Sequence, residues 1–252
     1  MVNADGASVR ALASGSRRNA GRIVFRWDGT NDDGALVDDG PYRLRIHFAD
    51  AHRTILIPNV VRVDTHPPAV EIADIAPRRI SPDGDGRRDA ARIVFRLSER
   101  AQPLLRADGA LVLRWKTRAA GAAAIVWRGT ASGRPLPAGF YRVTLQSRDL
   151  AGNLSATTEA ITVRIRYIEL ALRRPRARSG GLLRFRVLTD ARRFRWALLR
   201  RASMAHPLAS GTARAGAVAV RLPARIGAGR YRLRVTANDH SDGATIVVRT
   251  RR

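Results

Sequence analysis

A repeated motif constrains the fold of this chain more than any other feature of its sequence. Residues 27–44 contain Trp-Asp-Gly-Thr and then Asp-Gly-Pro-Tyr-Arg-Leu, and residues 127–143 contain Trp-Arg-Gly-Thr and then Ala-Gly-Phe-Tyr-Arg-Val. Residues 227–235 keep only the end of this pattern, Gly-Ala-Gly-Arg-Tyr-Arg-Leu-Arg-Val. The repeat predicts three related modules, of which the third has diverged.

The repeated segments have the pattern of short β-strands. In the third copy, Leu233 and Val235 alternate with arginines, which is the period of two of a half-buried strand. Further runs that are apolar and β-branched, or that alternate, are bounded by turn residues and predict strands at 23–25, 93–97, 161–165 and 194–198. Short strands joined by turns predict an all-β chain of tandem immunoglobulin-like β-sandwiches.

Two joints divide the chain into the predicted modules. The sequence His66-Pro67-Pro68 follows the predicted strand 55–63, and a proline pair cannot continue a central strand. The alternating run 161–172 instead predicts a direct strand-to-strand joint near Tyr167. We therefore predict domains at 1–66, 67–166 and 167–252.

The first predicted module is a partial sandwich. Only four residues precede its Asp5-Gly6 turn, whereas residues 70–107 precede the matching turn at Asp108 in the complete second module. A sandwich without its opening strands leaves an unpaired edge. We expect the chain to be a fragment of a longer protein, whose other domains are its first partners.

These residues resemble a known family. The segment 25–42 is similar to the FlgD-type immunoglobulin-like domain, and so is 127–153; Ser81 to Asp89 resembles the opening turn of the same module. The family occurs in flagellar hook-capping proteins and in large secreted or surface-attached bacterial proteins. The resemblance implies a fold and an extracytoplasmic setting, but the sandwich serves many roles.

The aromatic residues of the motif are predicted to be structural. Tyr42, Tyr141 and Tyr231 each follow a glycine by two positions and begin a strand, where a tyrosine hydroxyl can bond to the upstream backbone as in a tyrosine corner. The alternative is carbohydrate stacking on an exposed Trp115 or Trp196.

The chain is arginine-rich, with 46 basic and 21 acidic residues and a formal net charge of +25. Codon bias explains a preference for arginine over lysine, but not the loss of acids from residues 167–252, which hold 20 arginines and 4 acids. This strongly basic third module is the candidate polyanion-binding surface. Strand alternation predicts its two solvent-facing arginine rows to be Arg184 and Arg186, and Arg230, Arg232 and Arg234.

We expect these rows to be adjacent and to form one basic plate. Its ligand would be teichoic acid, an anionic lipid or a nucleic acid. The few interleaved aromatics argue against sequence-specific nucleic-acid recognition.

The loop 83–89 is the strongest metal candidate. Its sequence, Asp-Gly-Asp-Gly-Arg-Arg-Asp, offers Asp83, Asp85 and Asp89 as alternating oxygen ligands and resembles part of a calcium loop. The sequence favours a plain turn that enters the next strand over a calcium site, since another ligand and a distal glutamate are missing at the right spacing and Arg87 and Arg88 oppose cation binding. Apart from this possible calcium ion, no cofactor is expected.

Nothing in the sequence predicts catalysis. The absence of cysteine excludes disulfides, thiolate zinc sites and cysteine nucleophiles, and the five histidines have no metal-ligand spacing. Asp239-His240-Ser241-Asp242 is predicted to be a polar hairpin. We expect a protein that is not an enzyme.

The expected location is extracytoplasmic, secreted or at the cell surface, provided that an upstream signal is missing from this chain. No apolar run reaches the length of a membrane helix. We therefore expect a structural spacer or adhesion module, with polyanion binding by the third module as the alternative function.

Overall fold

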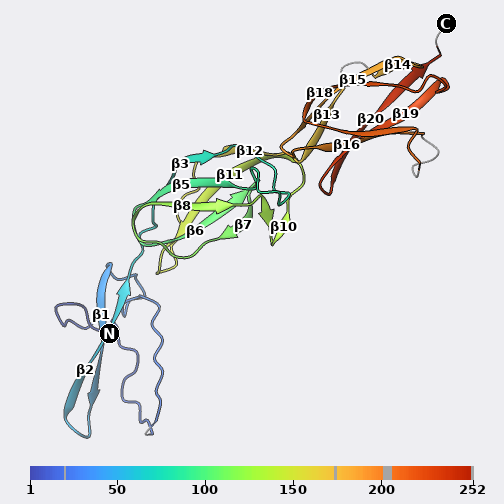
Figure 1. The fold of residues 1–252 in the computed structure, drawn as a ribbon. Helices are drawn as coiled ribbons and strands as arrows, with labels where there is room; N and C mark the ends of the chain where they lie inside the picture. Colours follow the sequence, from blue (N-terminus) through green and yellow to red (C-terminus); the bar gives the residue numbers. More distant parts are fainter. Residues whose placement is uncertain (20, 173–174, 201–205, 251–252) are drawn as a thin grey trace. The chain divides into compact units, whose positions relative to one another are not determined.

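The computed structural model describes residues 1–19, 21–172, 175–200 and 206–250. Within these residues every regular element is a β-strand, which confirms the predicted all-β fold (Figure 1). The chain forms two compact units, residues 1–67 with 149–154 and residues 68–148 with 155–252. The second unit contains two β-sandwiches with separate cores, and the division into three domains stays a prediction.

The first unit has little regular structure. Its strands β1 (Gly40–Phe48) and β2 (Arg53–Val63) form an antiparallel hairpin with a bulge between Arg43 and Arg45. Before β1, the described residues 1–19 and 21–39 contribute only isolated bridges, among them Val2 with Arg43. The buried apolar residues of this unit are few: Met1, Val2 and Tyr42.

The prediction of a strand at 23–25 is wrong. Residues 22–28 form no strand, and Ile23 and Val24 are 44% and 65% exposed. The matching segment of the second copy is β8 (Gly121–Trp127), which pairs along its whole length with β5 (Ala91–Leu97). A strand needs a partner for its backbone hydrogen bonds, and the described residues of the first unit supply none at this point.

The first sandwich of the second unit has a three-stranded sheet, ordered β3-β5-β8, and a five-stranded sheet, ordered β4-β12-β11-β6-β7. A separate short hairpin, β9 with β10, follows β8. The remaining strands are β3 (Val70–Ala76), β4 (Arg79–Ile80), β6 (Gln102–Ala107), β7 (Ala110–Arg114), β9 (Thr130–Ala131), β10 (Arg134–Pro135), β11 (Gly139–Arg148) and β12 (Ile161–Ile165). Alternate residues of β5 are buried, Phe95 among them, as expected for a strand with one face in the core.

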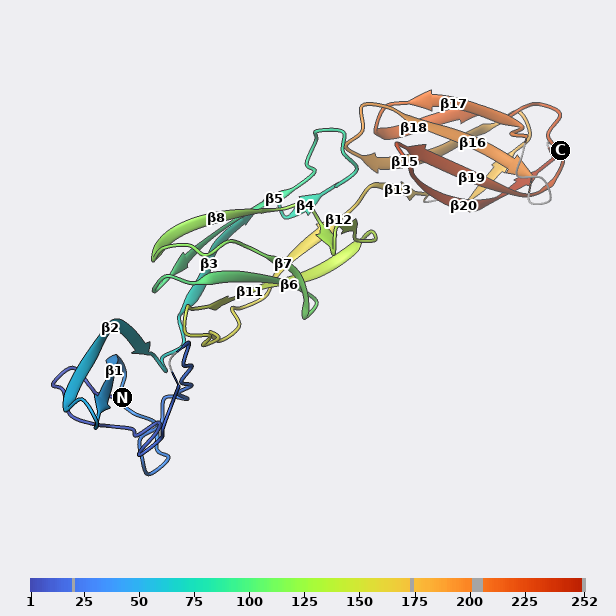
Figure 2. The ribbon, with the colours of Figure 1, turned by 90° about the horizontal axis from the view of Figure 1, so that it is seen from below.

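The second sandwich of this unit repeats that arrangement (Figure 2). Its sheets are ordered β13-β15-β18 and β14-β20-β19-β16-β17. The strands are β13 (Ile168–Ala171), β14 (Arg176–Arg178), β15 (Leu182–Thr189), β16 (Phe194–Arg200), β17 (Ala209–Ala213), β18 (Gly216–Arg221), β19 (Gly229–Ala237) and β20 (His240–Arg249). Apart from the β9–β10 hairpin, the sheets of the two sandwiches match strand for strand, so the diverged third copy shares the topology of the second.

Candidate functional site

The tyrosine corner is present in all three copies of the repeat. Each hydroxyl donates to the backbone carbonyl four residues earlier: Tyr42 to Asp38 at 2.7 Å, Tyr141 to Pro137 at 2.9 Å and Tyr231 to Gly227 at 2.8 Å. Burial is the main cause that raises the pKa of Tyr42 and of Tyr141. The predicted structural role of these tyrosines is therefore confirmed.

The tryptophans of the motif also make matching contacts. The indole N–H of Trp27 donates to the carbonyl of Thr30 at 2.7 Å, and that of Trp127 donates to the carbonyl of Thr130 at 3.0 Å. Trp127 is fully buried, whereas Trp27 is half-buried and meets the ring of Tyr42 edge-on at 5.0 Å.

Trp115 and Trp196 are not exposed stacking platforms. Both are half-buried and pack against the cores of their sandwiches. The guanidinium of Arg118 lies 5.9 Å from the centre of the Trp115 ring. The carbohydrate-stacking alternative assumes that one of these tryptophan rings is exposed. This assumption is wrong, because core packing covers much of each indole.

The joint between the two sandwiches of the second unit is short. Strand β12 ends at Ile165 and β13 begins at Ile168, so the alternating run predicted at 161–172 is divided between two sheets. Tyr167, between these strands, is 5% exposed and belongs to the core of the first of the two sandwiches.

Tyr167 contacts both sandwiches. Its hydroxyl donates to the carbonyl of Leu136 at 2.7 Å, and its own carbonyl accepts from the hydroxyl of Thr189 at 2.9 Å. Its ring stacks on His240 of β20, with 3.6 Å between ring centroids. Burial raises the pKa of Tyr167 to about 12.

Polar contacts add to this joint. Arg164 of β12 pairs with Glu169 of β13 at 2.6 Å. Asp242 of β20 accepts from the backbone N–H of Leu170 at 2.7 Å. Asn238, in the β19–β20 turn, donates its side-chain amide to Asp83 at 2.8 Å. The chain is thus fixed on both sides of Tyr167.

The loop 83–89 does not present its three aspartates as one ligand set. Asp89 accepts the backbone N–H groups of Gly84 at 3.0 Å and of Gly86 at 2.8 Å, one on each carboxylate oxygen. Asp85 accepts the N–H of Arg87 at 2.8 Å. Asp89 therefore closes the loop and is not among the carboxylates that approach one another, while its role as a metal ligand stays a prediction.

An aspartate that is distant in the sequence, Asp190, lies close to Asp83 and Asp85. Carboxylate oxygens of Asp83, Asp85 and Asp190 all lie within 4.8 Å of one another. Asp190 follows β15, and both of its carboxylate oxygens are buried without a hydrogen-bond partner among the described residues. The pKa of Asp190 is raised, first by burial and further by the charges of Asp83 and Asp85, although the nearby Ser81 hydroxyl opposes the shift.

Sequence reasoning missed Asp190 because nothing near it in the chain resembles a ligand motif. The one available signal was its position as a turn acid between two strands, in a segment with very few acids.

The arginine rows lie on two different sheets. Arg184 and Arg186 of β15 are exposed on the three-stranded sheet. Arg230 and Arg232 are exposed, and Arg234 is half-buried, on β19 of the five-stranded sheet. The alternating residues of both strands point into the same core, so the rows face opposite sides of the sandwich. The prediction of one continuous basic plate is wrong.

The four acids of residues 167–252 gather at one end of their sandwich. Glu169 lies in β13, Asp190 follows β15, and Asp239 and Asp242 lie in the β19–β20 hairpin. This is the end next to Tyr167. Arg184, Arg186, Arg230 and Arg232 form no ion pair with any acid in the part of the chain that the structure describes.

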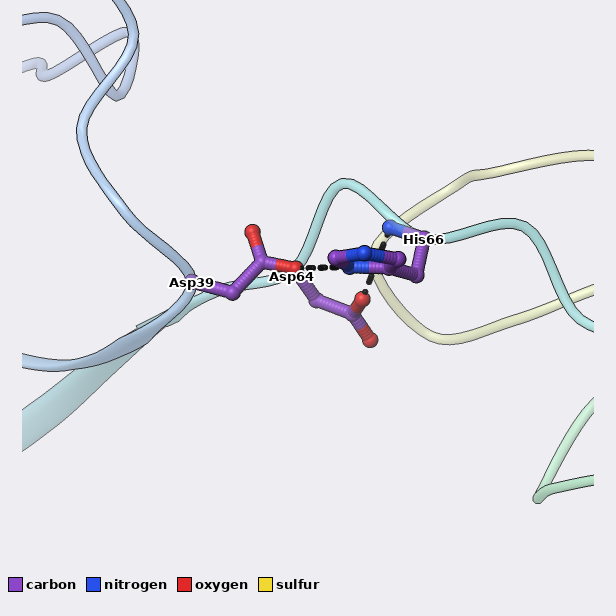
Figure 3. Close-up of side chains that lie close together, drawn as sticks. All are labelled: Asp39, Asp64 and His66. Atoms are coloured by element: carbon purple, nitrogen blue, oxygen red, sulfur yellow. Dashed lines mark hydrogen bonds and ion pairs between the residues drawn. The ribbon is translucent and has the colours of Figure 1, made fainter.

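A second polar cluster, in the first unit, was not predicted (Figure 3). Asp39 accepts from the backbone N–H of Thr65 at 2.9 Å and contacts the His66 ring nitrogen, while Asp64 accepts the N–H of His66 at 3.1 Å. These bonds lower the pKa of Asp39, the Thr65 N–H first and His66 second. They tie the start of β1 to the chain after β2.

The segment 239–242 forms the predicted polar hairpin. Ala237 pairs with His240, so Asn238 and Asp239 make a two-residue turn between β19 and β20. His240 stacks on Tyr167, and Asp242 accepts backbone N–H groups. Asp, His and Ser are the residue types of a catalytic triad, but here His240 packs against a ring and Asp242 bonds to the backbone.

Comparison with known proteins agrees with the motif. The family model of the FlgD Ig-like domain matches residues 2–51. No curated protein matches the sequence. Among the described residues, no helix is long and apolar enough to span a membrane.

Solved structures with Ig-like and fibronectin-like modules are similar only at low scores. The chain is 13% identical to the fibronectin(III)-like modules of Clostridium thermocellum CbhA, covering 72% of this chain and 95% of that one, with a TM-score of 0.27. It is 16% identical to the human OSCAR ligand-binding domain, covering 73% and 95%, with a TM-score of 0.27. For titin domains I67–I69 the identity is 13%, the coverage 74% and 66%, and the TM-score 0.29.

At such TM-scores these structures add nothing to the fold derived above from strand pairing. The family match is the finding that bears on identity, and it falls on the segment that carries the first Trp-Asp-Gly-Thr motif. Residues 2–51 match the model of the FlgD Ig-like domain family, as their motif predicted.

Proposed function

We propose that this chain is a non-enzymatic Ig-like repeat segment that serves as a structural spacer or adhesion module of an extracytoplasmic bacterial protein. The proposal rests mainly on the contacts that Tyr167 makes at the joint between the two sandwiches. A spacer must transmit position along its length, and a joint of two residues with side-chain contacts on both sides suits that task better than a flexible linker.

The stiffness of this joint can be tested with spin labels. The chain contains no cysteine, so Arg114→Cys and Arg214→Cys place a label on each sandwich of the second unit without competing sites. Both side chains are exposed. We expect a narrow distribution of label-to-label distances by pulsed electron paramagnetic resonance.

Two variants of Tyr167 sharpen this test. Tyr167→Ala removes the ring that stacks on His240 and should broaden the distribution, whereas Tyr167→Phe keeps the ring and should leave it narrow. A broad distribution in the unmodified chain would contradict a spacer function for this segment.

The family match at 2–51 supports the extracytoplasmic location and further domains as partners. The chain itself has a mass of 27.6 kDa. We expect an antibody against it to label intact cells of the source organism and to detect a protein of larger mass on an immunoblot. Labelling only after lysis would contradict the location.

A second candidate function is polyanion binding by the third module. The observation that favours it is the gathering of the acids at one end, which leaves the exposed rows Arg184 with Arg186 and Arg230 with Arg232 uncompensated. Since the rows face opposite sides, one flexible polyanion would engage about three arginines at a time. The slope of log K against log salt should then be about −2.

Heparin, teichoic acid and a DNA oligomer are suitable probes in a salt titration of the full chain. Reversal of Arg230, Arg232 and Arg234 to glutamate should weaken binding and flatten the slope if that row is the site, and reversal of Arg184 and Arg186 tests the other face. Absence of binding at low salt would leave only the spacer role.

A further inference from the structure

The cluster of Asp83, Asp85 and Asp190 brings together carboxylates from two sandwiches. Asp83 and Asp85 come from the loop before β5, and Asp190 comes from the turn between β15 and β16. We propose that these three carboxylates bind a calcium ion, which ties the 83–89 loop to the third module. This site goes beyond the spacer role and does not depend on it.

The burial of the Asp190 carboxylate is the observation that points to a bound ligand. Each of its two carboxylate oxygens is buried and lacks a hydrogen-bond partner among the described residues. A buried carboxylate without a well-formed hydrogen bond loses its hydration for little return, since the nearby Ser81 hydroxyl lies outside hydrogen-bond geometry. Two more carboxylates within 4.8 Å increase this cost through like-charge repulsion. A cation between the three would remove both penalties.

Arginine does not fill this role, although the chain is rich in it. Within the described part of the chain, none of the three carboxylates forms an ion pair with an arginine. Arg166 is close enough to Asp190 for the two charges to interact, but its ion pair is with Glu169 at 4.0 Å. Arg87 and Arg88 lie in the same loop as two of the carboxylates, yet among the described residues neither forms an ion pair with the cluster.

The chemistry of the site favours calcium over other metals. All of its candidate ligands are oxygen atoms, which suit a hard cation, and cysteine and histidine are absent from the cluster. The ligands sit on a loop and a turn, and calcium accepts the variable geometry of such ligands, whereas magnesium demands a near-octahedral shell. Water and the neighbouring side chains of Ser81 and Asn238 can complete the shell.

Asp89 has a supporting part in this proposal. By accepting the N–H groups of Gly84 and Gly86, it holds the loop in the curve that turns Asp83 and Asp85 toward the same point. It acts as a positioning residue for the two ligands and is not itself a ligand.

The test is a titration of the chelator-treated full chain with calcium chloride, followed by calorimetry and by thermal unfolding. We expect saturable binding of a single ion with a Kd of about 10⁻⁴ to 10⁻³ M, and a melting temperature that rises with calcium. Magnesium chloride at the same concentrations should have a much smaller effect.

Asp190→Asn gives the sharpest contrast. This variant should bind calcium about tenfold more weakly or worse, because it removes a charged ligand. Without calcium it should melt at the same temperature as the unmodified chain or higher, since it also removes the buried, repelled charge. With saturating calcium the order should reverse. A merely structural role for Asp190 would not produce this reversal.

Asp239→Asn is the matched control. It makes the same change of charge in the neighbouring β19–β20 turn, outside the cluster, and should bind calcium like the unmodified chain. Asp85→Asn, whose side chain is exposed, is a second variant that should also weaken binding if Asp190→Asn fails to fold.

Two results would overturn the calcium site. One is the absence of any heat or thermal shift at millimolar calcium, and the other is unchanged affinity in both Asp190→Asn and Asp85→Asn. Neither result affects the spin-label test of the Tyr167 joint in calcium-free buffer, so the failure of this site and the failure of the spacer role are distinguishable.

Discussion

The first and second copies of the repeat form the same local contacts but differ in what surrounds them. Trp27 and Trp127 make the same indole hydrogen bond, and Tyr42 and Tyr141 make the same hydroxyl bond. In the second copy, however, the tryptophan is only 1% exposed and lies in a large core, whereas the first copy has few buried apolar residues.

The difference comes from the partner strands. Strands β3, β5 and β6 precede the second copy of the motif and supply the sheets that cover its tryptophan. The first unit contains no matching strands among its described residues, and its run 23–25 stays irregular. The motif therefore closes a turn by itself, but a core forms only where long-range strand pairing is available.

Replacement of the two tryptophans should give the largest difference in stability between the two copies. Trp127→Ala should cost about 3–5 kcal/mol of local stability, because it removes a fully buried side chain. Trp27→Ala should cost about 1–2 kcal/mol, since Trp27 is half-buried. Native-state hydrogen exchange of the full chain measures each segment separately. Equal losses would show that the two copies are equally packed.

The glycines that follow the tryptophans should give the next largest contrast. Gly29 and Gly129 both have positive φ, at 81° and 62°, so alanine is strained at either position by about 1 kcal/mol. A Cβ on Gly129 would also lie 2.9 Å from Pro82, while a Cβ on Gly29 would meet nothing within 4 Å.

We therefore expect Gly129→Ala to cost about 1–3 kcal/mol more than Gly29→Ala. Thermal unfolding, assigned to each unit by hydrogen exchange, measures the difference. A larger loss in Gly29→Ala would mean that the first unit is packed around this turn more tightly than its exposed surroundings indicate.

The corner hydroxyls should behave alike in the two copies. Tyr42→Phe and Tyr141→Phe each remove one hydrogen bond to a carbonyl four residues earlier and should each cost about 1 kcal/mol. Hydrogen exchange of the β1 and β11 backbones measures both. A loss confined to one copy would mean that the corner depends on the core after all.

Alkaline pH should give the smallest and most selective effect. The pKa of Tyr167 is raised to about 12 by burial, above that of a tyrosine in the unfolded chain. Unfolding then releases a proton, so the stability gained from the neutral phenol is complete below pH 10 and is lost as the pH rises toward 12.

The melting temperature of the second unit should therefore fall more steeply from pH 10 to 12 in the unmodified chain than in Tyr167→Phe, which has no ionisable hydroxyl. Identical profiles would contradict the buried state of this phenol in solution.

The residues predicted from sequence were those whose contacts are local. The corner hydroxyls bond four residues upstream and the indoles three residues downstream, so a short motif contains both partners. The all-β fold followed from alternation within single strands. The strand at 23–25 failed because the same local pattern has no partner in the first unit.

The candidate sites depended on long-range contacts and were predicted less well. Asp83 and Asp85 were found from their loop, but Asp89 bonds to the loop backbone, and Asp190 approaches from another sandwich. The alternation of Arg184 with Arg186, and of Arg230 with Arg232, placed these side chains correctly on outward faces. It could not show that the strands belong to opposite sheets.

The strand-rich, repeated character of the chain, its tyrosine corners and the basic composition of residues 167–252 could be predicted from sequence, because each depends on residues that are close in the chain or on simple composition. The tertiary structure decided which strands have partners, which face each arginine row occupies and which aspartate joins the 83–89 loop. These depend on pairings between segments far apart in sequence, whose geometry is set by sheet order and by packing of the two cores.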